Sequence, residues 1–176
     1  MSQTADVDGM RLTMPVGWWV WKYDDSSFHR NQFQSLAGGS KAMDAVALAS
    51  DGTLWLIELK DYRINRRSKP SSVYEEVAAK ARATLAGLCV ARVKANDPQE
   101  QRWAQDASDC IQIRIALQLA QRGQPSKLFP NVVDPADARD KLRKVLRPVD
   151  PRALCAVGDI ATQNATLPWE TSAIQT

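Results

Sequence analysis

The stretch KAMDAVALASDGTLWLIELKDYR, residues 41–63, decides the fold because it contains two apolar runs joined by a short polar turn. The runs cover residues 43–49 and 53–60, and this arrangement is typical of a β-hairpin. Within them stand three charged residues: Asp44, Glu58 and Lys60. A charge inside a buried strand costs free energy unless it is paired, so the interpretation depends on whether these three side chains meet.

The length of the turn decides whether the two carboxylates meet. A three-residue loop at residues 50–52, ending in a left-handed glycine, places Asp44 directly opposite Glu58. Opposed residues have Cβ atoms roughly 4.5–5.5 Å apart on one face of a sheet, and Lys60 shares that face. A two-residue turn at 51–52 would instead send the carboxylates to opposite faces. A shared site therefore requires the longer loop or a bulge.

Both faces of this hairpin are largely apolar, as in a central sheet that is covered on both sides. Capping residues and apolar periodicity predict helices over residues 71–88 and after the Asp-Pro pairs at 97–98 and 134–135. Other strands are expected at residues 17–23, 110–119 and 152–157. The fold class predicted is α/β (α+β), with a mixed central β-sheet flanked by helices.

One domain is expected over residues 1–158, with residues 159–176 as a flexible C-terminal tail. The first seventeen residues have weak periodicity and predict an irregular arm that holds at most a short strand. A short helix is expected within the polar segment at residues 28–36.

Composition excludes several chemistries. The chain has 176 residues, a formal net charge of +3 and one histidine, His29, which rules out a His-rich zinc site. Cys89, Cys110 and Cys155 are far apart and form no CxxC, which predicts a reducing compartment and no thiolate zinc site. The glycine motifs that cradle phosphates are missing. Without a signal-peptide pattern or a long apolar run, we expect a cytoplasmic protein with no membrane partner.

Asp44, followed thirteen residues later by Glu58-Leu59-Lys60, resembles the core of the PD-(D/E)xK nuclease superfamily, which has a restriction-endonuclease-like fold. The resemblance covers roughly residues 18–119. It implies that Asp44, Glu58 and Lys60 are catalytic, and that Asp44, Glu58 and the main-chain carbonyl of Leu59 bind the metal. Many members add an acidic residue from a helix before the hairpin, and that region offers none in a convincing helix.

The chemistry of these side chains agrees with that implication. Mg²⁺, or Mn²⁺ in its place, takes one or two carboxylates together with water and phosphate oxygens. Such an ion activates water and stabilises a phosphodiester in reaction, and Lys60 would orient or deprotonate the attacking water. In the metal-free protein, Asp44→Ala is expected to relieve repulsion between the two acids.

A simpler interpretation also accounts for these residues. Glu58 and Lys60 would then form an exposed ion pair at a strand end, with Asp44 as a turn residue. His29 is either a surface histidine or a group that approaches the site from its loop.

Beyond the hairpin, the segment KDYRINRRSKP holds four further basic residues, which we expect to bind nucleic-acid phosphates: Arg63, Arg66, Arg67 and Lys69. A solvated loop is the alternative. The function predicted is a metal-dependent nuclease that hydrolyses DNA in preference to RNA. Antiviral defence is one biological role considered, and a homodimer or a larger protein complex is one oligomeric state considered. The alternative is a catalytically silent nuclease-fold subunit that binds nucleic acid or a protein partner.

Overall fold

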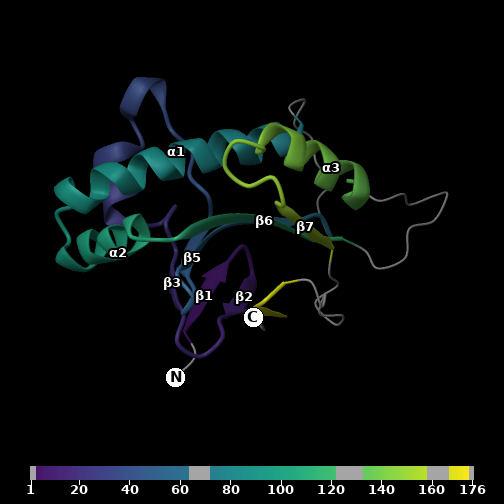
Figure 1. Ribbon diagram of the computed structural model, residues 1–176, viewed down its shortest axis with the longest axis horizontal. Helices are drawn as coiled ribbons and strands as arrows, with labels where there is room; N and C mark the ends of the chain where they lie inside the picture. The colour runs from purple at the N-terminus through teal and green to yellow at the C-terminus, as the bar shows by residue number, and fades with distance from the viewer. Residues whose placement is uncertain (1–2, 64–71, 122–132, 158–166, 175–176) are drawn as a thin grey trace.

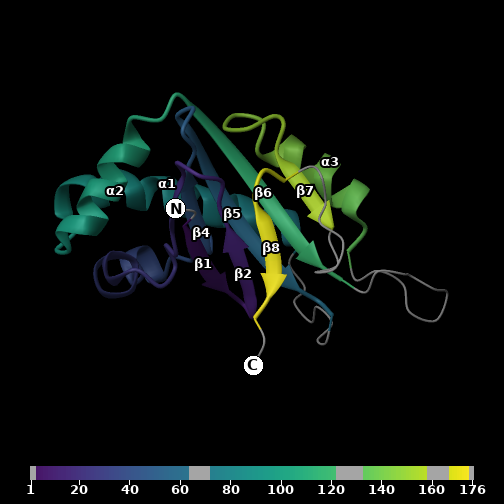
Figure 2. The ribbon, with the colours of Figure 1, turned by 90° about the horizontal axis from the view of Figure 1, so that it is seen from below.

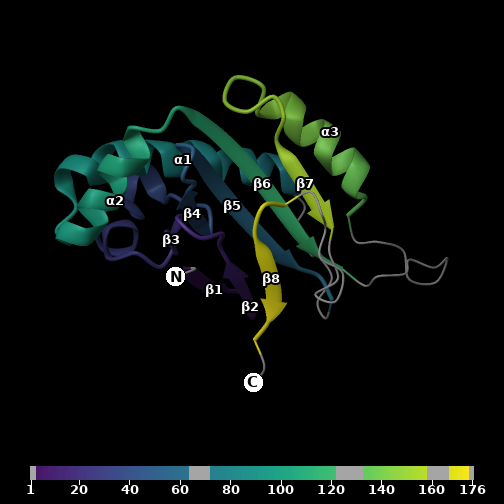
Figure 3. The same ribbon diagram turned by 60° about the horizontal axis from the view of Figure 1, so that its bottom comes forward.

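The structure is a computed structural model, which describes residues 3–63, 72–121, 133–157 and 167–174 (Figure 1). Its centre is a five-stranded sheet with strand order β3-β4-β5-β6-β7. The strands are β3 (Trp19–Trp21), β4 (Ala45–Leu48), β5 (Thr53–Asp61), β6 (Gln112–Ala120) and β7 (Leu154–Val157). The pairs β3–β4 and β4–β5 are antiparallel, whereas β5–β6 and β6–β7 are parallel. The predicted mixed central sheet is confirmed, and Figure 3 shows its strands side by side.

Three α-helices cover one face of this sheet (Figure 1): α1 (Val73–Lys94), α2 (Pro98–Ser108) and α3 (Pro135–Val145). Helices α1 and α2 form the crossover between the parallel strands β5 and β6, as such a connection requires. Asp97 and Asp134 cap α2 and α3 by accepting hydrogen bonds from backbone N–H groups of the first turns. All three helices lie where the sequence predicts them.

The other face is covered by a second sheet, which the sequence interpretation missed (Figure 2). Its antiparallel strands are β1 (Thr4–Val7), β2 (Met10–Thr13) and β8 (Glu170–Ala173), in the order β1-β2-β8. The irregular arm is therefore a hairpin, and the predicted flexible tail is wrong over the residues of β8. Trp169 is buried, and its indole N–H donates to Gln118 of β6 at 3.2 Å, so this end of the chain is held against the central sheet.

The β4–β5 hairpin has the register that a three-residue loop requires. Ala45 pairs with Ile57 in the ladder, and one further residue places Asp44 opposite Glu58. In the loop, Gly52 has a φ of 81°, and its N–H donates to the Ala49 carbonyl at 3.0 Å. A side chain at this φ would be strained, so the glycine permits the longer loop.

The hydrophobic core lies on both faces of the central sheet. Toward the helices, Val46, Leu56 and Leu117 pack against α1, whereas Ala47 and Ile57 pack against the small sheet. The tryptophans are part of this packing, and the rings of Trp18 and Trp55, for example, stack at 6.4 Å between centroids.

The segment before β4 contains two short helical turns, η1 (His29–Phe33) and η2 (Leu36–Gly38), as the sequence predicts for residues 28–36. Glu100 of α2 anchors the first of them. Its buried carboxylate accepts hydrogen bonds from the N–H groups of Ser27 and Phe28, both at 2.8 Å.

Candidate functional site

Asp44 and Glu58 lie side by side on the helix-covered face of the central sheet. Asp44 stands immediately before β4 and is 5% exposed, and Glu58 lies within β5 and is 0% exposed. In the parallel ladder Glu58 pairs with Leu117 of β6, which is also fully buried, so an apolar residue borders the carboxylate on that side. The prediction that the two acids share a face is confirmed.

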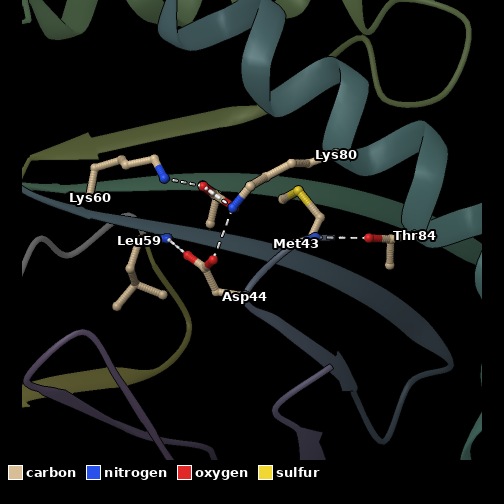
Figure 4. Close-up of polar contacts among 7 residues, drawn as sticks. Met43, Asp44, Leu59, Lys60, Lys80 and Thr84 are labelled. Carbon is tan, nitrogen blue, oxygen red and sulfur yellow. Dashed lines mark hydrogen bonds and ion pairs between the residues drawn. The ribbon is translucent and has the colours of Figure 1, made fainter. Parts of the chain in front are cut away.

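A lysine from α1 lies between the two acids (Figure 4). The ammonium nitrogen of Lys80 is 3.1 Å from Oδ1 of Asp44, and 2.6 and 2.8 Å from Oε1 and Oε2 of Glu58. Lys80 itself is 9% exposed. Three carboxylate oxygens therefore surround one cation position, which the ammonium group holds.

Lys60 lies on the other side of Glu58. Its ammonium nitrogen is 2.5 Å from Oε1 of Glu58, and its side chain is 18% exposed, the more accessible of the two lysines. The backbone N–H of Leu59 donates to Oδ2 of Asp44 at 2.8 Å, which fixes the Asp44 carboxylate against β5. The structure thus brings Asp44, Glu58 and Lys60 together, and the metal-ligand role of the Leu59 carbonyl stays a prediction.

Burial and charge oppose each other in this cluster. Burial, and then repulsion from Asp44, raise the pKa of Glu58 to about 7, although both lysines favour the ionised form. Burial disfavours the charged form of Lys80, but its attraction to Glu58 and Asp44 is stronger and raises the pKa of Lys80 above its usual value. Lys80 is therefore held as a cation between the acids.

Helix α1 is fixed in place by contacts along the same stripe as Lys80. Four residues on, the hydroxyl of Thr84 accepts a hydrogen bond from the N–H of Met43 at 2.9 Å (Figure 4). Three residues further, Gly87 lies directly against Tyr23. A Cβ at this position would be only 2.1 Å from the phenol oxygen, so the close approach requires glycine. These contacts position α1 against the segment that leads into β4 and contains Asp44.

A hollow of about 290 Å³ lies beside the cluster, and its lining includes Lys80, Asp24, His29 and Ser40 as well as the cationic residues Arg30 and Lys41. Burial, and then repulsion from Asp44, raise the pKa of Asp24 to about 6, whereas burial lowers the pKa of His29. His29 is 4% exposed, so the prediction of a surface histidine is wrong. It lies instead in the wall next to the site.

The basic loop is described only at its start. The guanidinium of Arg63 pairs with Asp61, with Nη2 2.5 Å from Oδ2, so its charge is partly balanced within the chain. Arg66, Arg67 and Lys69 lie outside the described residues, and their role in binding nucleic acid stays a prediction.

Two expectations are corrected by this geometry. In the ion pair between Glu58 and Lys60, the Glu58 side chain is fully buried, so the interpretation as an exposed ion pair is wrong. Asp44 has partners in Lys80 and the Leu59 N–H, so Asp44→Ala would leave both with one bond fewer and should not relieve strain in the metal-free protein.

Lys80 is the site residue that the sequence interpretation missed. The available signal was its spacing: Lys80 falls on the buried stripe of α1, three residues after Val77 and four before Thr84. A lysine on a buried helix face requires a carboxylate partner.

The donor set suits a hard divalent cation. Asp44 and Glu58 offer converging carboxylate oxygens, and Mg²⁺ needs only one or two carboxylates beside water. Among the described residues, no group of three or more His, Cys, Asp or Glu side chains is placed to hold a metal. A metal ion at this position requires that the Lys80 ammonium leave it.

Comparison with known proteins gives one partial similarity. A cysteine–tRNA ligase of Neisseria meningitidis serogroup A / serotype 4A (strain DSM 15465 / Z2491) is 36% identical over 122 residues, a match that covers 64% of this chain and 17% of the ligase. The chain thus resembles a small part of that protein. No family model matches the chain, and no solved structure matches it.

In the part of the chain that the structure describes, no helix is both long and apolar enough to cross a membrane.

Proposed function

We propose that the chain is a nuclease that uses Mg²⁺ or Mn²⁺ to hydrolyse phosphodiester bonds, in DNA in preference to RNA. One observation carries the proposal: Oδ1 of Asp44 and both carboxylate oxygens of Glu58 surround a single cation position, and Lys60 contacts the same Glu58 carboxylate. Asp44, just before β4, and Glu58-Leu59-Lys60 of β5 are the residues that carry the resemblance to PD-(D/E)xK nucleases.

Each residue has a distinct role in this proposal. Asp44 and Glu58 would hold the ion, with the Leu59 carbonyl as a further ligand. A bound Mg²⁺ would lower the pKa of a water molecule and stabilise negative charge on the phosphodiester. Lys60, which is partly exposed and paired with Glu58, would orient the attacking water, or help to deprotonate it once the Lys60 ammonium has lost its own proton.

The basic loop would supply the binding energy for the substrate. Arg66, Arg67 and Lys69 follow the site in the sequence, and Arg63 stands two residues after the end of β5, where the strand carrying Glu58 leaves the sheet. Contacts from these side chains to phosphates would position the backbone without reading its sequence.

A catalytically silent binding subunit is the second candidate, and the position of Lys80 favours it. The Lys80 ammonium already occupies the position between the two acids and pairs with both, and Glu58 is fully buried. The partial similarity to a cysteine–tRNA ligase, whose name gives tRNA as its substrate, makes RNA one ligand for such a subunit. On this account the chain would bind nucleic acid or a protein without cleaving anything.

A cleavage assay separates the two candidates. End-labelled DNA and RNA of one sequence are incubated with the protein and Mg²⁺ or Mn²⁺, with and without EDTA. The proposal requires cleavage that EDTA abolishes, that Glu58→Gln abolishes and that Lys60→Met slows by about 10²–10⁴-fold. Glu75→Gln, at an exposed position of α1, is the matched control and should cleave like the wild type. Binding without metal-dependent cleavage would support the silent subunit.

A further inference from the structure

The hollow beside the acidic pair contains an unusual concentration of unsatisfied polar atoms. Among the described residues, five buried side-chain N or O atoms have no hydrogen-bond partner. Three of them belong to residues that line this hollow: Oδ1 of Asp24, Nδ1 of His29 and Oγ of Ser40. Unsatisfied buried polar atoms are rare because each costs free energy, so the residues of this wall can accommodate a further hydrogen-bond donor.

The chemistry of these atoms suits an ammonium group. A carboxylate oxygen and a hydroxyl oxygen accept hydrogen bonds, as does Nδ1 of His29 in the neutral tautomer that carries its proton on Nε2, and a lysine ammonium donates three. Lys80 lines the same hollow, and its charge acts on both Asp24 and His29. Its four-carbon stem gives the ammonium several reachable positions.

We propose that Lys80 has two alternative positions and acts as a gate on the metal site. In the first, which the structure shows, its ammonium lies between Asp44 and Glu58. In the second it turns into the hollow and donates to Asp24, His29 and Ser40, which frees the two carboxylates for a divalent cation. The cation and Lys80 thus exchange places, and the positive charge between the acids is never lost.

This inference rests on the proposed metal site and deepens it. Without a second position, a departing ammonium would lose its carboxylate partners inside the protein, and the metal would have to compensate for that cost. The acceptors in the hollow reduce the cost and so increase metal affinity. Asp24 is therefore a positioning residue, which acts through Lys80.

The test is a titration of the folded protein with Mn²⁺, in which free Mn²⁺ is measured by electron paramagnetic resonance. Asp24→Asn should weaken Mn²⁺ binding by about tenfold, equivalent to about 1.4 kcal/mol. Asp25→Asn is the matched control, because Asp25 also lines the hollow but pairs with Lys22 and Arg30, and its affinity should not change. Lys80→Met should bind Mn²⁺ more tightly than the wild type.

The double variant Lys80→Met with Asp24→Asn should bind Mn²⁺ as tightly as Lys80→Met alone. Without Lys80 there is no ammonium group for Asp24 to accept a hydrogen bond from. Equal affinity of Asp24→Asn and the wild type would overturn the inference, as would an Asp24 effect that persists without Lys80. If Lys80→Met does not fold, the Mn²⁺ affinities of Asp24→Asn and Asp25→Asn are compared, and the inference requires that only Asp24→Asn bind more weakly than the wild type. Failure of the wild type to bind Mn²⁺ overturns both the gate and the proposed function.

The two proposals can also fail separately. The predicted Mn²⁺ pattern in a protein that cleaves no nucleic acid would contradict the nuclease and retain the gate. Metal-dependent cleavage with unchanged Mn²⁺ affinity in Asp24→Asn would retain the nuclease and contradict the gate.

Discussion

The ammonium nitrogen of Lys80 lies 2.6 Å from Oε1 of Glu58, although the two residues are 22 positions apart and belong to a helix and a strand. Glu58 is fully buried, and its second neighbour in the cluster is another acid, Asp44. In the account proposed here, both the stability of the fold and the access of a cation to the site depend on this one helical lysine.

Replacing Lys80 should destabilise the metal-free protein. Lys80→Met leaves Asp44 and Glu58 close together with only Lys60 to balance them, and breaking a buried pair typically costs about 3–5 kcal/mol. The loss should be larger at pH 8 than at pH 5. Without Lys80 the pKa of Glu58 rises further, and a carboxyl with a raised pKa in the folded state reduces stability as pH rises.

Urea unfolding of Lys80→Met and the wild type at both pH values measures this effect. Lys94→Met, at an exposed position of the same helix, is the control and should stay within about 0.5 kcal/mol of the wild type. A loss in Lys80→Met no greater than that of the control would mean that the ion pairs contribute nothing.

Asp24 should give the protein a separate pH dependence. Its pKa is raised to about 6 in the folded protein from a usual value of 3.8, because of burial first and then the charge of Asp44. Between these values the folded state retains a proton that the unfolded state has lost, so stability should fall as pH rises from about 4 to about 6.

Asp24→Asn removes this ionisation. Its stability relative to the wild type should therefore increase across the same pH window and stay constant above it. Unfolding free energies measured from pH 4 to pH 7 test this, with Asp25→Asn as the control. A difference between Asp24→Asn and the wild type that is independent of pH would contradict the raised pKa.

Gly87 should tolerate no side chain while Tyr23 is present. Alanine favours a helix over glycine by about 1 kcal/mol, but its Cβ would be 2.1 Å from the Tyr23 hydroxyl oxygen. Gly87→Ala should thus lower the melting temperature. Tyr23→Phe removes this oxygen, which has no hydrogen-bond partner among the described residues, and should restore part of the loss in the double variant. Additive effects of the two changes would contradict this contact.

The basic loop gives a prediction about nucleic-acid binding. If Arg66 and Arg67 contact phosphates, replacing both with alanine should weaken DNA binding similarly across sequences and reduce its dependence on salt. Fluorescence anisotropy at several salt concentrations measures both quantities, and Arg139→Ala, at an exposed position of α3, is the control. An unchanged salt dependence would exclude the loop from the binding surface.

The hairpin could be predicted from the sequence because local signals determine it. Gly52 permits the three-residue loop, the loop sets the register, and the register brings Asp44 opposite Glu58. The β1–β2 hairpin had a comparable signal that was overlooked. Asp8 and Gly9 both have positive φ, 48° and 74°, which is what a two-residue Asp-Gly turn between strands requires.

Lys80 and β8 depend on contacts that are distant in the sequence. A lysine in the middle of a helix resembles a solvated one until the sheet beneath that helix is known, and the spacing of Lys80 was the only clue. Strand β8 is polar and mostly exposed, and its position follows from pairing with β2 and from hydrogen bonds between Gln118 and its neighbours. Patterns within β8 itself do not contain this information.

The most direct test of the central claim is the anomalous diffraction of a crystal of this protein soaked in Mn²⁺. We predict one anomalous peak in contact with the carboxylates of Asp44 and Glu58, with the Lys80 ammonium displaced toward Asp24. A well-occupied Mn²⁺ elsewhere, with Lys80 still between the two acids, would contradict the account and leave the cluster as a purely structural ion-pair network.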